Sequence, residues 1–153
     1  MTAPTVSAQA ERLAGVLKGM PGLTTALPRR PDSIQSPDLP LLWLWAQDAS
    51  YSESAFGNKS LETLRTWEAR VYVRLATTGV DAEGEIATEA LIDALAHAIS
   101  SHPVLATEGG QVFDVLLDQG SDEGITALPF GEKWYVGTVV RFRTRVVRFN
   151  DSY

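Results

Sequence analysis

Two stretches of the chain repeat apolar residues at the spacing of an amphipathic helix. The first begins near Ser7, a candidate N-cap, and ends at Gly19 and Pro21. Its apolar positions are Ala10, Leu13, Ala14, Leu17 and Met20. The second begins after a capping Asp81 and runs to about Ser101. Its apolar positions are Leu91, Ile92, Leu95, Ala98 and Ile99. The pattern therefore predicts two helices, each with one buried face.

Other stretches follow the two-residue period of β-strands. Residues 65–75 alternate strictly between apolar and polar side chains. Residues 111–118 also read as a strand, with Phe113, Val115 and Leu117 on one face. Residues 39–45 are apolar on both faces, which predicts a strand that is either central in the sheet or covered on its second face by another element. Trp43 and Trp45 share one face of that strand, and we expect both to pack in the core.

The last predicted strand, residues 133–149, is unusually long. At about 3.3 Å per residue it would span roughly 50 Å, so it either bends or projects past its sheet to touch a neighbour. Its alternation changes at Val146 and Val147, which predicts a β-bulge or bend there.

A polar segment at about residues 46–60 separates two of these strands and is predicted to be a long, partner-facing loop. It contains Tyr51 and Phe56. Aromatic side chains are enriched where proteins bind each other, so the two residues are candidate interface anchors. The alternative is that they pack back and hold the loop in place.

The order of the predicted elements indicates an α+β fold. At 153 residues the chain has the length of one domain, and we expect residues 1–153 to form a single domain. A mostly antiparallel β-sheet would pack against the two α-helices.

Charge is segregated along the sequence, although the total is only −6. Residues 77–132 carry 11 acidic and no basic side chains, whereas residues 133–149 carry 5 basic and no acidic ones. The two blocks could neutralise each other within one molecule. Alternatively, they could form opposite faces that meet in a head-to-tail ring.

Within the basic block, alternation places Arg141, Arg143 and Arg145 on one face of the long strand. Such a row could contact phosphates, form cross-strand pairs with acids such as Glu68, or form a salt-bridged subunit interface. The acidic total favours pairing within or between chains over nucleic-acid binding.

The sequence contains few residues or motifs that are typical of catalytic sites. It has no cysteine, and its two histidines, His97 and His102, do not share a helix face. It has no nucleophile elbow and no glycine-rich phosphate-binding loop. We therefore expect no enzymatic activity, no cofactor and no metal. The longest nearly apolar run, Leu39 to Ala46, is too short to span a bilayer, so we expect no membrane partner.

Four stretches together resemble the tail terminator (minor tail, tail-completion) proteins of long-tailed bacteriophages. They are the first helix ending at Gly19-Met20-Pro21, the strand Arg70–Leu75, the helix segment Leu91–Leu95, and the closing strand Tyr135–Phe142. The resemblance covers nearly the whole chain and is one of pattern and order.

The resemblance implies a ring-forming, non-enzymatic subunit without cofactors. In that family a hexameric ring of the protein caps the tail tube, stops its polymerisation and offers a docking surface to the head connector. The implied partners are further copies of the chain, the tail-tube protein and the head–tail connector. The implied location is the virion, at the head–tail junction, after assembly in the host cytoplasm.

An acidic inner surface would let DNA pass through such a ring without binding, because like charges repel. Part of the acidic block would line this channel. The candidates are three residues of the second helix and three of a predicted acidic turn, namely Glu85, Glu89, Asp93, Asp118, Asp122 and Glu123.

Other functions remain open from the sequence. The nearest is another component of the same junction, either a connector or completion protein or a tail-tube subunit. A small-ligand-binding α+β domain would need a deep pocket with clustered titratable groups. A nucleic-acid-binding module would use the arginine row and bind DNA in a strongly salt-dependent way.

Overall fold

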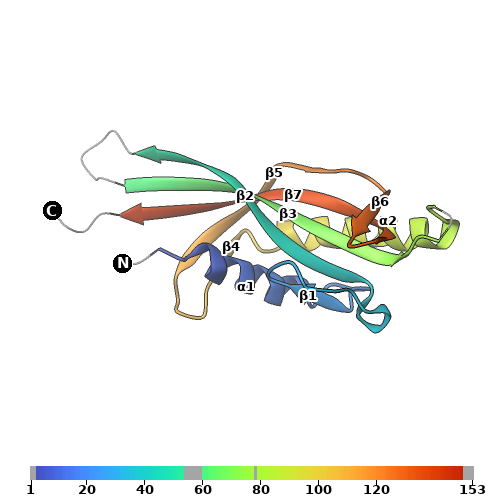
Figure 1. Ribbon diagram of the computed structural model, residues 1–153. Helices are drawn as coiled ribbons and strands as arrows, with labels where there is room; N and C mark the ends of the chain where they lie inside the picture. Colours follow the sequence, from blue (N-terminus) through green and yellow to red (C-terminus); the bar gives the residue numbers. More distant parts are fainter. Residues whose placement is uncertain (1–2, 54–59, 78, 150–153) are drawn as a thin grey trace.

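Two long neighbouring strands, β3 (Ser60–Leu75) and β7 (Lys133–Phe149), form the centre of the sheet and pair antiparallel over almost their whole lengths (Figure 1). The structure is a computed structural model that describes residues 3–53, 60–77 and 79–149. Of residues 118–120 and 149 it describes the backbone alone. The predicted strand at 133–149 is confirmed with the same bounds.

In the described residues seven strands form one mixed sheet in the order β1-β2-β3-β7-β5-β4, and β6 also pairs with β7. The remaining strands are β1 (Thr25–Leu27), β2 (Leu41–Glu53), β4 (Val104–Ala106), β5 (Val112–Asp122) and β6 (Thr126–Phe130). Of the strand pairs in the described ranges, β1–β2 is parallel and the others are antiparallel. Together with two α-helices, this sheet confirms the predicted α+β class.

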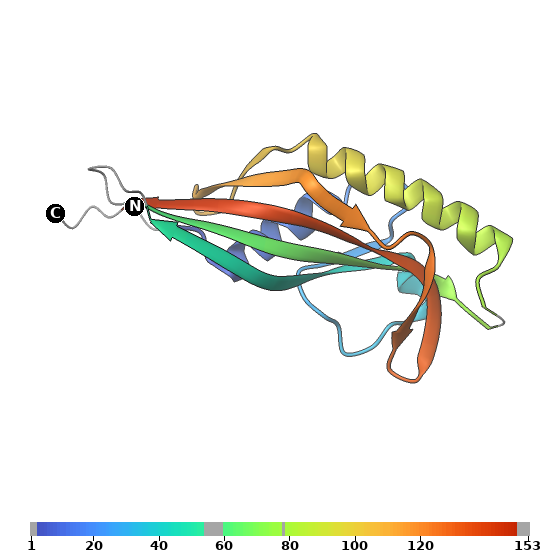
Figure 2. The same ribbon diagram turned by 90° about the horizontal axis from the view of Figure 1, so that it is seen from above.

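Both α-helices cover the same face of the sheet. Helix α1 (Val6–Leu17) contributes Leu13 and Leu17 to a core that also contains Leu91 and Leu95 of α2 (Ala82–Ser100). The α1 cap differs from the prediction, because Oγ1 of Thr5, not Ser7, accepts the hydrogen bond from the Ala8 amide. Figure 2 shows α2 lying on the side of the sheet that holds β5.

A second, smaller core covers the opposite face. It joins Trp43 of β2 and Tyr72 of β3 to Phe130 of β6, and residue Ile34 of the segment before β2 packs with them. A single-turn 3-10 helix, Ser36–Asp38, lies in that segment. The two cores explain why the first part of β2 is apolar on both faces, as its sequence predicted.

The prediction of a loop at 46–60 is wrong for residues 46–53 and 60, which are strand, and residues 54–59 lie outside the described residues. Strand β2 continues to Glu53 and β3 begins at Ser60, and residues 49–53 pair with residues 61–65 after a register shift beyond Ala46. Residues 49–53 are mostly polar, and four of the five are exposed. Backbone pairing, which leaves no hydrophobic period in the sequence, holds them in strand form.

The β-bulge predicted at Val146 and Val147 is also wrong. The pairing of β3 with β7 is continuous there, with Val146 buried and Val147 exposed. The register shifts instead between Tyr72 and Arg74, near Gly137. A side chain on Gly137 would overlap the carbonyl oxygen of Val71, so the close approach of the two strands at this point requires glycine.

Candidate functional site

The ends of three strands form a projecting arm, which we define as residues 49–53 of β2, 60–65 of β3 and 144–149 of β7. Figure 1 shows the three strand ends running together beyond the helices. At the base of the arm, the Arg65 guanidinium donates to the Gln47 carbonyl oxygen at 2.8 Å and so braces the register shift in β2. The arm is thus a paired extension of the sheet.

Tyr51, the first candidate anchor, lies on this arm with its side chain 64% exposed. It does not pack back into the core, so it is available to a partner. The second candidate, Phe56, lies outside the described residues. On β7, Val147 is also exposed, which gives the arm an apolar contact point besides Tyr51.

The arginine row of β7 forms ion pairs within the chain. Arg141 lies between two acids, with Nη2 2.7 Å from Glu123 Oε1 and Nε 3.4 Å from Glu68 Oε2. Glu68 also pairs with Arg70, 3.1 Å away. The pairing of Arg141 with Glu68 is one of the alternatives that the sequence left open.

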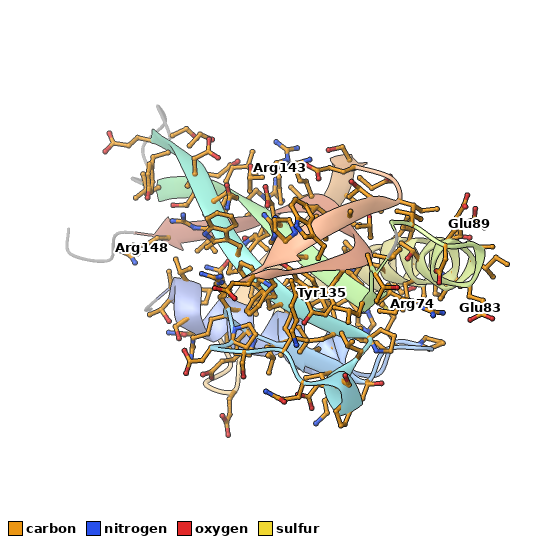
Figure 3. The ribbon with its side chains drawn as sticks, turned by 45° about the vertical axis from the view of Figure 1, so that its right-hand side comes forward. Arg74, Glu83, Glu89, Tyr135, Arg143 and Arg148 are labelled. Atoms are coloured by element: carbon orange, nitrogen blue, oxygen red, sulfur yellow. The ribbon has the colours of Figure 1, made fainter. Side chains whose placement is uncertain are left out.

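Arg145 pairs with Asp114 of β5, with Nη2 2.6 Å from Oδ2. The hydrogen bond to Asp114 raises the pKa of the Arg145 guanidinium, and the bond to Glu123 does the same to the pKa of Arg141. Arg143 projects from the same face of β7 between them (Figure 3). The acidic and basic blocks therefore meet, in part, within one molecule.

A second charged surface is the outer face of α2. Glu85, Glu89 and Asp93 are exposed there, and in the part of the chain that the structure describes none of them forms an ion pair. Glu83 behaves differently, because Arg74 reaches it at 2.8 Å (Figure 3). The outer face of α2 thus carries three exposed carboxylates without an ion pair among the described residues.

The other acidic candidates are placed differently. Strand β5 extends to Asp122, so no turn begins at Asp118, whose side chain is outside the description. Asp122 accepts a hydrogen bond from the Gly124 amide at 2.8 Å, and Glu123 is the ion-pair partner of Arg141. Both carboxylates are thus engaged within the chain.

An aromatic and cationic cleft of about 710 Å³ lies beside β2. Trp43 and Trp45 line it with ring centroids 5.8 Å apart, and the Arg70 guanidinium lies 5.5 Å from the Trp45 ring. The core placement predicted for Trp43 is confirmed, but that for Trp45 is wrong, because Trp45 is 48% exposed. Alternation correctly places Trp45 on the same face of β2 as Trp43. It does not show that the smaller core, which covers Trp43, stops short of Trp45.

The histidines lie at the end of α2, where His102 Nδ1 is 2.8 Å from the Ala98 carbonyl oxygen. Among the described residues no group of three or more His, Cys, Asp or Glu side chains is placed to hold a metal ion. No helix in the described ranges is long and apolar enough to cross a membrane.

Comparison with known proteins leaves the chain without an assigned family. No protein-family model matches it, and no curated protein matches it. The surfaces described above are therefore the basis for inferring its function.

Proposed function

We propose that this chain is a structural subunit of a bacteriophage tail, namely the tail terminator. Copies of it form a hexameric ring that caps the tail tube, stops its polymerisation and receives the head connector. Its role is assembly and not catalysis, and it acts in the virion at the head–tail junction. The order and pattern of the elements, which resemble that family, support this proposal.

The observation that carries the proposal is the projecting arm. The ends of its three strands extend past both helices, and Tyr51 and Val147 on the arm are exposed. Ordering the backbone of these strand ends costs conformational entropy. The few contacts of the arm within the isolated chain offset little of that cost. A neighbouring subunit or the tail tube would supply the missing contacts.

The charge distribution supports a ring through which DNA passes. Pairing of Arg141 with Glu68 and Glu123 leaves the β7 row poorly suited to bind phosphate. The unpaired acids of α2 remain as a negative surface, and we assign Glu85, Glu89 and Asp93 to the channel wall. A negative wall repels the DNA backbone, so DNA passes through the channel without binding to the wall.

Electron microscopy of the purified protein, with its mass in solution, tests this proposal directly. We expect closed rings with the mass of six subunits and no long tubes at high concentration. Addition of the protein to polymerising tail-tube protein should shorten the tubes, with the ring bound at one end. Growth of the protein alone into long tubes would instead identify it as a tail-tube subunit. A monomer that neither forms rings nor binds tubes would contradict both readings.

A further inference from the structure

The cleft beside β2 lies on an open strand edge. Strand β1 pairs with β2 only from Leu41 to Trp43, and among the described residues no strand pairs with that edge from Leu44 onward. An uncovered strand edge offers backbone N–H and C=O groups to any incoming strand. Native proteins often protect such edges with charged residues, proline or a bulge. Leu44, Trp45 and Ala46 carry none of these, and the register shift in β2 comes only after Ala46.

The cleft surrounds this edge from both faces of the sheet. On the helix side it is lined by Leu44, Ala46 and Trp67 of the sheet and by Val6 and Ala10 of α1. This wall is apolar. An incoming strand would therefore meet an apolar surface with every second side chain.

The opposite wall is aromatic and cationic. Trp43, Trp45 and Phe130 form its rings, and Arg30 and Arg70 lie against them, with the Arg30 guanidinium 4.8 Å from the Phe130 centroid. Arg29 also lines the cleft, and no carboxylate does so among the described residues. The intervening side chains of an incoming strand would thus face positive charge.

Two hydrogen-bond donors in this wall are unsatisfied. Trp43 is only 5% exposed, and its Nε1 has no hydrogen-bond partner in the described residues. The Nε of Arg70 has none either, although the same guanidinium binds Glu68 through Nη1. Buried donors without partners are costly. Both atoms are buried, so an acceptor in the cleft would reach them only after these side chains turn toward it.

We infer that the cleft binds one extended strand of a partner protein by β-augmentation. The strand pairs with the β2 edge from Leu44 onward, directly after the place of β1. Its side chains alternate, with apolar residues toward Val6 and Ala10 and carboxylates toward Arg30 and Arg70.

The chain already uses this chemistry within its own sheet. In β5, Asp114 alternates with Phe113 and Val115 and binds Arg145 of the adjacent strand. Strand β5 is itself paired with β7 and β4, so it is not free to fill the β2 cleft of a second copy. We assign the occupant to another protein, with a strand that alternates apolar and acidic residues to match the two walls of the cleft. This inference does not depend on ring formation, and either can fail without the other.

The test uses a synthetic strand, the acetylated and amidated heptapeptide Ser-Val-Glu-Val-Glu-Val-Ser, titrated into the full chain. Tryptophan fluorescence and calorimetry should give a dissociation constant below about 1 mM. Backbone amide signals of Leu44, Trp45 and Ala46 should shift in NMR spectra. Two peptides serve as controls, one with lysine in place of glutamate and one N-methylated at alternate amides. Both should bind at least about tenfold more weakly, because they lack the charge or the donors.

Variants of the cleft complete the test. Trp45→Ala and Arg70→Gln should each weaken peptide binding about tenfold or more, with unchanged circular dichroism. Trp134→Ala removes a similarly exposed tryptophan outside the cleft and should leave binding unchanged. Equal binding of all three peptides, or an equal effect of Trp134→Ala, would overturn the inference. Absence of peptide binding together with loss of self-association in Trp45→Ala would also overturn it, by assigning the cleft to contacts between copies.

Discussion

Trp67 Nε1 donates a hydrogen bond to Thr144 Oγ1 at 2.8 Å, deep between β3 and β7. The same hydroxyl donates to Gln9 Oε1 of α1, also at 2.8 Å. Thr144 is fully buried, and it lies where the arm leaves the body of the protein. One hydroxyl therefore ties helix α1 to the base of the arm and satisfies two other buried polar groups.

Thr144→Val should destabilise the protein, since it leaves the Trp67 N–H and the Gln9 amide oxygen without hydrogen-bond partners. We expect a loss of about 1–3 kcal/mol in the free energy of unfolding, measured by urea denaturation. Thr138→Val on the same strand is the matched control. Thr138 is equally buried but its hydroxyl has no partner, so this change should be neutral or stabilising. Equal losses in the two variants would contradict the proposed role of the network.

Gly137→Ala should be strongly destabilising, because the new Cβ would overlap the Val71 carbonyl oxygen where the β3–β7 register shifts. Overpacking of this kind costs roughly 1–3 kcal/mol or more. Gly15→Ala is the control. A Cβ at Gly15 meets nothing within 4 Å, and alanine in a helix interior is favoured over glycine by about 0.5–1 kcal/mol. Thermal unfolding should therefore move in opposite directions for the two variants.

The sequence predicted elements whose stability comes from burial or capping. Helix α2 begins directly after Asp81, whose carboxylate accepts the Gly84 amide at 2.8 Å, and its apolar stripe faces the core. The outer half of β2 was missed, because its strand form depends on pairing with β3 and on no apolar pattern. Strand β6 was missed as well. It is five residues long and contains Pro129, which the sequence alone does not reconcile with a strand.

The candidate site was predictable only where charge or alternation identified it. The acidic face of α2 and the shared face of the β7 arginines follow from spacing alone. Which arginine meets which acid depends on the β3–β7 and β5–β7 registers, which no local pattern specifies. The cleft depends on β1 ending at Leu27, so it becomes visible only once the strand order is known.

Replacing the acids of α2 tests the proposed channel wall. The triple variant E85K/E89K/D93K should fold normally, since all three side chains are exposed. We expect the assembled variant to bind double-stranded DNA at low salt, with an affinity that falls steeply as salt rises, whereas the original protein binds none. Fluorescence anisotropy with labelled DNA measures this. If the variant assembles and still binds no DNA, the three residues do not face the channel.

Glu68 and Glu123 provide a second charge test, because they neutralise Arg141. In E68Q/E123Q the guanidinium loses both carboxylate partners, and the row on β7 gains two units of net positive charge. Salt-dependent DNA binding should then appear in this variant as well. Arg141→Gln added to the pair should remove most of that binding. Retained binding without Arg141 would place the DNA contact elsewhere.

The arm itself is tested at Tyr51. Tyr51→Ser removes an exposed aromatic group, so the free energy of unfolding should change by less than about 0.5 kcal/mol. If the arm contacts a neighbour, ring formation or tube capping should nonetheless weaken about tenfold or more, as expected for an aromatic hot spot. Trp134→Ser, at another exposed aromatic residue in the β6–β7 hairpin, is the control for general loss of apolar surface. Analytical ultracentrifugation and counts of capped tubes measure the two effects. Rings and caps that persist in Tyr51→Ser but disappear in Trp134→Ser would move the subunit contact from the arm to the opposite end of β7.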